Sequence, residues 1–267
     1  MERNVVKMMS KTFLHKISFQ LIGLFGVLLF TITAHADDAS CPEYAVYHTT
    51  TPQRPATSDK FLQSQELQNQ EPKDADIILL GDSLTRSWKT KDLQKKLPDY
   101  RVLNLGVGAD RTQQIIWRLS EMNASEYNPK YVVLWIGTNN LRTDPTCAIS
   151  QGIVTIIDML TRFWPNSKVV VLETPPRGLD FSAYMPKRLV MYDEAKEKFA
   201  DKNVKFVNID KELTCGITKF SEEYHTRYKT FKKVPSPCEN YKSDLLHMTK
   251  DAYQILDDLV AGIVEGK

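Results

Sequence analysis

Residues 76–84 read Asp-Ile-Ile-Leu-Leu-Gly-Asp-Ser-Leu. The run of four apolar side chains from Ile77 is typical of a short strand that is buried on both faces of a sheet. Gly81 ends the run, and the polar residues Asp82 and Ser83 follow at once. The segment therefore predicts a buried strand that leads through a turn into a helix beginning near Ser83.

Further runs of strand length have the same apolar, β-branched character, and most stop at or near a glycine or proline. They are residues 101–105, 131–136, 168–172 and 204–207. Segments of helical length with apolar residues at helical spacing alternate with them. These are residues 110–122, 148–163, 185–200 and 249–264. The alternation predicts one α/β domain with a parallel sheet covered on both faces. Ligands of such sheets bind beyond the carboxyl ends of the strands, where these glycines lie.

The first 36 residues have the composition of an export signal. A basic start precedes an apolar run at 21–30, and residues 33–36 read Thr-Ala-His-Ala, with small residues at both recognition positions of a signal peptidase. The apolar run is shorter than the roughly 20 residues that a membrane span needs. We expect residues 1–36 to be a signal peptide and the mature protein to be exported, periplasmic or secreted, without a stable membrane span. A retained N-terminal anchor is the alternative.

The charge of the mature chain is close to balanced. Removing residues 1–36 takes away four of the 35 basic residues and one of the 33 acidic residues, which leaves 31 and 32. No overall positive field attracts nucleic acid or anionic lipid, so we expect no nucleic-acid partner.

All four cysteines lie beyond the export signal, at Cys41, Cys147, Cys215 and Cys238. An even number in an oxidising compartment predicts disulfides, and four cysteines allow three pairings. The sequence does not choose among these pairings. We lean to Cys215 with Cys238, which would close a local loop, and Cys41 with Cys147.

Two stretches depart from the alternation of strands and helices. Residues 37–75 are rich in Pro, Thr, Gln and charge, and they predict an extended lead-in with one short helix near Phe61–Leu67, ahead of a domain at 76–267. Residues 211–243 form a long, basic and aromatic connection, and such loops in compact domains are often functional. A solvated loop without a role is the alternative. The candidate substrate-binding residues in this connection are Tyr224, Arg227 and Tyr228.

Ser83 is the candidate nucleophile. Its place at a strand-to-helix turn exposes it at the sheet edge, where helix N-terminal amides favour the negative charge that acyl transfer develops. Serine is also a common helix cap, and residues 81–84 alone do not separate the two roles.

His247 is the candidate general base, and Asp244 is its candidate partner. The export signal aside, the chain has only three histidines, and His247 alone has an aspartate three residues before it and a helical segment after it. A carboxylate at this spacing can reach one ring nitrogen and hold the tautomer, while the other nitrogen faces the serine. A surface histidine beside a loop carboxylate is the alternative.

Two further strand ends offer donors for an oxyanion. Gly106 can present an unobstructed backbone amide, and Asn139 can present a side-chain amide, although both residues are also common in turns. Gly106-Val107-Gly108 is not a dinucleotide fingerprint, because Arg111 stands where the third glycine would be.

Together these residues resemble the ordered blocks of the SGNH, or GDSL-type, hydrolases. The blocks are residues 81–84, Gly106, residues 137–140 and residues 244–247, and the resemblance spans roughly residues 76–265. Within that family the chain is most similar to the catalytic α subunits of intracellular platelet-activating-factor acetylhydrolase and their bacterial relatives. The segments that carry this likeness are residues 104–112, 117–119, 135–140 and 175–178.

The resemblance implies a flavodoxin-like three-layer α/β/α sandwich with a five-stranded parallel sheet. It implies that Ser83 is the nucleophile, His247 the base and Asp244 its orienting residue. The amides of Ser83 and Gly106 and the side chain of Asn139 would bind the oxyanion. No metal and no organic cofactor is implied.

The sequence thus predicts an exported serine esterase that hydrolyses a small, acetyl-like acyl ester of a glycan or lipid through an acyl-enzyme on Ser83. An O-acetyltransferase acting on a cell-envelope polysaccharide with the same triad is the alternative, and a binding protein that lost catalysis is a third. The export signal and residues 211–243 depart from the acetylhydrolase subunits and leave the substrate open. The oligomeric state is open as well.

Overall fold

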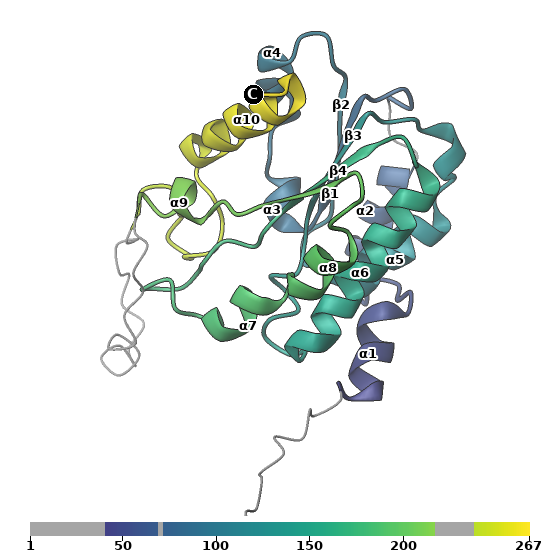
Figure 1. The fold of residues 1–267 in the computed structure, drawn as a ribbon, viewed down its shortest axis with the longest axis vertical. Helices are drawn as coiled ribbons and strands as arrows, with labels where there is room; N and C mark the ends of the chain where they lie inside the picture. The colour runs from purple at the N-terminus through teal and green to yellow at the C-terminus, as the bar shows by residue number, and fades with distance from the viewer. Residues whose placement is uncertain (1–40, 69–71, 217–237) are drawn as a thin grey trace, which may run out of the picture. The chain divides into compact units, whose positions relative to one another are not determined.

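A five-stranded parallel sheet forms the centre of the computed structural model, which describes residues 41–68, 72–216 and 238–267 (Figure 1). The spatial order of the strands is β2-β1-β3-β4-β5. Their bounds are Ile77–Gly81 for β1, Val102–Gly106 for β2, Tyr131–Trp135 for β3, Lys168–Leu172 for β4 and Val204–Val207 for β5. Each of the five apolar runs in the sequence is therefore a strand of one sheet, as predicted.

The register of the central strands brings their carboxyl ends to one level. Gly81 at the end of β1 lies opposite Gly106 of β2 on one side and Trp135 of β3 on the other. All pairings are parallel, so the loops that follow β1, β2 and β3 leave the sheet at the same edge. This edge gathers the segments that the sequence analysis singled out for chemistry.

Alternate side chains of the strands pack against helices on opposite faces. Ile78 and Leu80 of β1 are buried in one core and Ile77 and Leu79 in another. The first core includes residues of α5 (Thr112–Glu121), α6 (Thr146–Phe163) and α8 (Asp193–Lys198). The second includes residues of α3 (Ser83–Arg86), α4 (Thr90–Lys96), α9 (Asp210–Leu213) and α10 (Lys250–Glu265). This is the expected three-layer α/β/α sandwich.

The predicted helices all form, and one of them is interrupted. The segment 185–200 contains α7 (Met185–Val190) and α8, separated at Met191 and Tyr192. Both of these side chains are fully buried, and the hydroxyl of Tyr192 donates to the carbonyl of Ile136 at 3.0 Å. The helix is therefore interrupted where the buried side chain of Tyr192 bonds to the segment that follows β3. A short 3₁₀ helix, Ala124–Glu126, precedes β3.

The N-terminal segment differs from the extended lead-in that we expected. The helix predicted near residues 61–67 lies within α2 (Ser58–Gln68), but an additional helix, α1, spans Glu43–Thr50. The described part of this segment belongs to the same compact unit as the sheet. Only Ala45 and Thr49 of helix α1 are buried, so the helix does not need an apolar stripe along one face. Its sequence therefore gave no helical signal.

Two disulfides pair the four cysteines as we favoured. Cys41 is bonded to Cys147 at the start of α6, and Cys215 is bonded to Cys238. The first fixes α1 beside α6, and the hydroxyl of Thr49 adds a buried hydrogen bond to the carbonyl of Ala148 at 2.6 Å. The export signal lies outside the described residues. Among the helices of the described part, none is long and apolar enough to cross a membrane.

Candidate active site

Ser83 is the first residue of α3, directly after the turn that closes β1. Asp82 is the helix cap, because its Oδ1 accepts a hydrogen bond from the amide of Leu84 at 2.9 Å. Gly81 allows the close approach of β3, since a Cβ at this position would lie 2.2 Å from the carbonyl oxygen of Trp135. The capping role considered for Ser83 is thus taken by its neighbour, and the hydroxyl of Ser83 is left for another partner.

The structure brings Ser83, His247 and Asp244 into one chain of hydrogen bonds. The hydroxyl Oγ of Ser83 lies 2.8 Å from Nε2 of His247. The other ring nitrogen, Nδ1, lies 2.7 Å from Oδ2 of Asp244. Ser83 and His247 are 164 residues apart in the sequence, yet the geometry is that of a nucleophile, a base and an orienting carboxylate.

The carboxylate of Asp244 is held in its ionised form. Partial burial works to raise its pKa, but hydrogen bonds from the backbone and ring of His247 and from the amide of Leu246 outweigh burial, so the pKa lies below its ordinary value. Its Oδ1 accepts from the amides of Leu246 at 3.1 Å and His247 at 2.9 Å. One carboxylate oxygen of Asp244 therefore holds the local turn, and the other bonds to the ring of His247.

Backbone hydrogen bonds fix the turn that carries Asp244 and His247. The amide of Lys242 donates to the carbonyl of His247 at 2.7 Å, and the amide of Gly178 donates to the carbonyl of Leu245 at 2.9 Å. Leu245 itself has a left-handed backbone with a φ of 58°. The turn is therefore attached both to itself and to the loop after β4.

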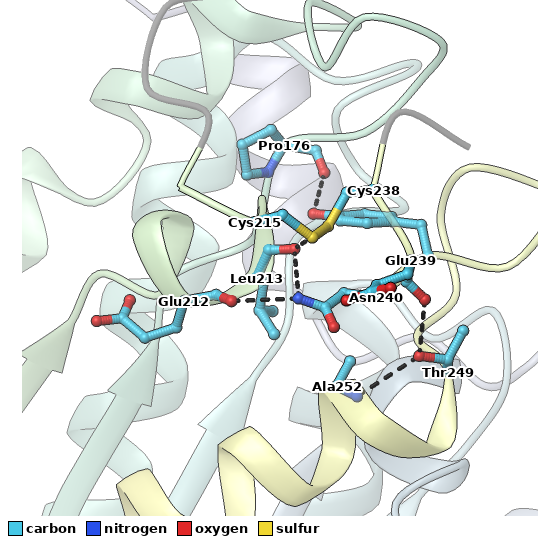
Figure 2. The surroundings of a disulfide bond; sticks show 10 residues. Pro176, Glu212, Leu213, Cys215, Cys238, Glu239, Asn240, Thr249 and Ala252 are labelled. Atoms are coloured by element: carbon cyan, nitrogen blue, oxygen red, sulfur yellow. Dashed lines mark hydrogen bonds between the residues drawn. A yellow bond between two sulfur atoms is a disulfide. The ribbon is translucent and has the colours of Figure 1, made fainter. Parts of the chain in front are cut away.

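The Cys215–Cys238 disulfide anchors the base of the same segment (Figure 2). Next to it, the side-chain amide of Asn240 donates to the carbonyls of Glu212 and Leu213, at 3.2 and 3.1 Å (Figure 2). The hydroxyl of Thr249 donates to the carbonyl of Glu239 at 3.1 Å. These contacts tie the segment before His247 to α9 and to the start of α10.

Gly106 does not have the free amide that the oxyanion prediction required. Its N–H donates to Oδ1 of Asn104 at 2.8 Å. A Cβ on Gly106 would lie 2.2 Å from the backbone nitrogen of Arg86, so glycine is needed here for the packing of β2 against α3. The assignment of Gly106 as a donor is therefore corrected: it is a packing glycine.

Ala109, three residues further on, is an exposed residue whose amide is free among the described residues, unlike that of Gly106. Its φ is 68°, in the left-handed region that favours glycine. Within the described part of the chain, the amide of Ala109 has no hydrogen-bond acceptor. Sequence reasoning missed it, because a search for glycine amides passes over an alanine, and the left-handed turn is visible only in the backbone.

Asn139 lies where its side chain can reach the same turn. Its Nδ2 donates to the carbonyl of Asp110 at 2.8 Å, and Oδ2 of Asp82 lies 3.4 Å away. The amide group has two hydrogens, of which one bonds to Asp110 and the other makes only a long hydrogen bond to Asp82. Asn139 thus lies between the residue before Ser83 and the turn at Ala109.

A sequence model of the GDSL-like lipase/acylhydrolase family matches residues 79–255, more than half of the chain. The chain belongs to this family. The match includes Ser83, Asp244 and His247, and it confirms the resemblance to the GDSL-type hydrolases.

Curated relatives cover a shorter part of this GDSL-like chain. The chain is 34% identical over 107 residues to platelet-activating factor acetylhydrolase IB subunit alpha1 of Rattus norvegicus, which is 40% of this chain and 46% of that protein. Subunit alpha2 of Homo sapiens is 31% identical over 107 residues, with the same shares. The chain thus spans about half the length of the curated relatives it matches.

Solved structures share the fold at low sequence identity. A GDSL-like lipase from Bacteroides thetaiotaomicron VPI-5482 aligns with a TM-score of 0.57 at 17% identity, over 78% of this chain and 98% of that one. A carbohydrate acetylesterase from Sinorhizobium meliloti aligns with a TM-score of 0.53 at 16% identity, over 72% and 99%. At these identities the likeness concerns the GDSL-like fold alone.

A buried arginine lies beneath the site of this GDSL-like domain. Arg118 of α5 donates to Oδ2 of Asp110 at 2.9 Å and to the carbonyls of Leu105 at 2.8 Å and Gly81 at 3.3 Å. It therefore joins the ends of β1 and β2 to the Ala109–Asp110 turn. Arg118 lies in one of the segments that carry the family resemblance, but nothing in the sequence indicates this structural role.

Two buried carboxyl groups near this arginine have raised pKa values. Burial raises the pKa of Asp110 to about 6, although the charge and hydrogen bond of Arg118 work in the opposite direction. Burial also raises the pKa of Asp82 to about 7, against the hydrogen bond from Leu84 and with a further contribution from the charge of Asp110. The floor of the site is thus poorly solvated, as an electrostatic catalyst requires.

The candidate substrate-binding residues Tyr224, Arg227 and Tyr228 lie in the stretch 217–237, outside the described residues. Their role stays a prediction.

Proposed function

We propose that this chain is an exported serine esterase that hydrolyses a small acyl ester through an acyl-enzyme on Ser83. The observation that carries the proposal is the pair of hydrogen bonds from Ser83 to His247 and from His247 to Asp244, at 2.8 and 2.7 Å. Membership of the GDSL-like lipase/acylhydrolase family supports it.

In the first half-reaction, Oγ of Ser83 attacks the ester carbonyl while Nε2 of His247 accepts its proton. Asp244, which stays ionised because its pKa is lowered, stabilises the imidazolium that forms. His247 then gives the proton to the leaving alcohol, and the acyl group remains on Ser83. In the second half-reaction, His247 activates a water molecule that releases the acid.

The tetrahedral oxyanion needs donors at the mouth of the site. We assign this role to the amide of Ser83 at the first turn of α3, to Nδ2 of Asn139 and to the amide of Ala109 in place of Gly106. Ala109 is an exposed residue whose amide has no acceptor among the described residues, whereas the amide of Gly106 donates to Asn104. Preorganised donors of this kind are worth roughly 10²–10³ in kcat each.

The substrate that we propose is an acetyl-like ester of a glycan or lipid. The matched relatives are named for the acetyl ester of platelet-activating factor, and a structural neighbour is a carbohydrate acetylesterase. Export is supported by the two disulfides, which persist in oxidising compartments. The signal-like sequence of residues 1–36 supports it as well.

The proposal is tested by assaying the mature chain and Ser83→Ala on p-nitrophenyl esters of increasing acyl length. We expect the highest kcat/KM on the shortest chains and a loss of several orders of magnitude in Ser83→Ala. The same assay with a sugar acceptor measures acyl transfer. A product dominated by acylated sugar would favour the acetyltransferase alternative, and activity in neither assay would contradict the proposal.

A further inference from the structure

A cavity of about 320 Å³ lies beside the Ala109 turn, and its lining includes polar and cationic side chains. One wall comes from the N-terminal segment, with His48, Gln53 and Lys60. The opposite wall is the turn at Gly108–Ala109 and the start of α5, with Arg111. A cavity of this size holds a small polar group next to the proposed oxyanion site.

The cationic groups of Lys60 and Arg86 both lie close to Gly108, which lines this cavity. A Cβ built on Gly108 would lie 3.0 Å from Nζ of Lys60 and 3.1 Å from Nη1 of Arg86. Arg86 is on α3, three residues after Ser83, and Lys60 is on α2. The two charges therefore converge from different elements on the turn that precedes Ala109.

No acidic side chain of the described part neutralises Lys60 or Arg86 by an ion pair. Asp110, which lines the cavity, is buried and paired with Arg118 at 2.9 Å, and Lys60 acts on it only through its charge, without an ion pair. Asp144, near His48, accepts a hydrogen bond from the side chain of Asn140 at 2.8 Å. Like charges that are left together at a pocket mouth favour an anionic ligand, which removes their mutual repulsion.

The neighbours of Lys60 hold it in place. Phe61 lies against Trp117 of α5, with ring centroids 5.8 Å apart, and the guanidinium of Arg54 stacks on Phe61 at 4.7 Å. The buried hydroxyl of Ser64 donates to the carbonyl of Lys60 at 2.8 Å. The backbone that presents the lysine is therefore a packed part of the domain.

We infer that the ester substrate carries an anionic group, a carboxylate or a phosphate, close to its acyl group, and that Lys60 and Arg86 bind this anion. The inference rests on the proposed function, because it places the anion beside the acyl group that Ser83 attacks. Ammonium and guanidinium groups form strong, charge-assisted hydrogen bonds with both kinds of anion. Arg111, which lines the cavity together with Lys60, adds a further positive charge there.

Three matched acetyl esters test the inference on the full mature protein. They are methyl 4-O-acetyl-glucoside, in which the acetyl group is on the carbon next to C5, the corresponding glucuronide with a carboxylate, and the corresponding glucoside 6-phosphate. For the wild-type enzyme we expect kcat/KM to be about tenfold higher or more for at least one of the two anionic esters than for the neutral one. Preference for the glucuronide identifies a carboxylate, and preference for the 6-phosphate identifies a phosphate.

The double variant Lys60→Ala, Arg86→Ala is expected to lose this preference. Its kcat/KM for the anionic ester falls roughly tenfold to a hundredfold, mainly through KM, while the neutral ester is unaffected. Lys205→Ala is the matched control, an exposed lysine on β5 at the opposite edge of the sheet, and should change neither. On the wild-type enzyme, raising the salt to about 1 M should reduce the preference, because ions screen exposed charges at that concentration.

Equal kcat/KM on all three esters, or an equal fall on all three in the double variant, would overturn the inference. A salt-independent preference would also overturn it. Each outcome is distinct from failure of the proposed function, which would show as persistent hydrolysis of the neutral ester by Ser83→Ala.

Discussion

Gly106 ends β2 and Ala109 lies on the turn that follows, and the roles that we propose for them are the reverse of what residue type alone indicates. Glycine is needed at Gly106 because the backbone of Arg86 leaves no room for a Cβ. Ala109 is an exposed residue with a left-handed φ of 68° and an amide that bonds to no acceptor among the described residues. A sequence shows which residues lack a side chain but not which amides are already bonded, so Ala109 could not be proposed as a donor in advance.

The two residues should respond to substitution in opposite ways. Gly106→Ala forces a Cβ against backbone, which costs about 1–3 kcal/mol or more and lowers the melting temperature by several degrees. Ala109→Gly relieves a left-handed alanine, worth about 1–2 kcal/mol, but it raises the entropy of the unfolded chain, which costs about 0.4–1 kcal/mol of stability. We expect a small rise in melting temperature and retained kcat. Calorimetry with steady-state kinetics measures both, and a stable Gly106→Ala would contradict the packing role.

Asn139 was predicted from its position after β3, and the structure places its amide between Asp82 and Asp110. If it donates to the oxyanion, Asn139→Ala should lower kcat by roughly 10²–10³ with little change in KM. Steady-state kinetics on p-nitrophenyl acetate checks this, with thermal melting as the control for folding. A change confined to KM would indicate substrate binding, and a large loss of stability would indicate only a structural turn.

At the scale of elements, the strands were predictable and the N-terminal helices only in part. Buried parallel strands such as β1 and β3 are apolar on both faces, so their signal is continuous and does not depend on tertiary partners. Helix α1 buries only two of its eight residues, and Tyr44 and Tyr47 are 77% and 67% exposed. It is fixed by the Cys41–Cys147 bond, which a sequence of four cysteines leaves undetermined.

Removing this disulfide should destabilise the domain and leave the chemistry in place. Cys41 and Cys147 are 106 residues apart, and closing a loop of that length is worth about 4–5 kcal/mol in the chain-entropy view. We expect the double variant Cys41→Ser, Cys147→Ser to melt well below the wild type and to exchange the amides of α1 faster, with kcat on a small ester retained. Hydrogen exchange by mass spectrometry and calorimetry measure these effects. Unchanged exchange in Glu43–Thr50 would show that packing alone holds α1.

At the scale of the whole molecule, the site depends on contacts between distant parts of the chain. Ser83 follows the first strand, and His247 precedes the last helix. The order of the motifs along the chain predicted that they would meet at the carboxyl edge of the sheet, because every strand points the same way. The supporting contacts of Arg118, and the cations that cover Gly108, depend on side-chain packing and carry no pattern of their own in the sequence.

The most direct test of the central claim is covalent labelling of the mature protein with a fluorophosphonate, followed by intact-mass measurement and peptide mapping. An activated serine should give one adduct, on the peptide that contains Ser83, and Ser83→Ala should remain unlabelled. Adduct formation at another residue, or equal labelling of Ser83→Ala, would contradict the assignment of Ser83 as the nucleophile.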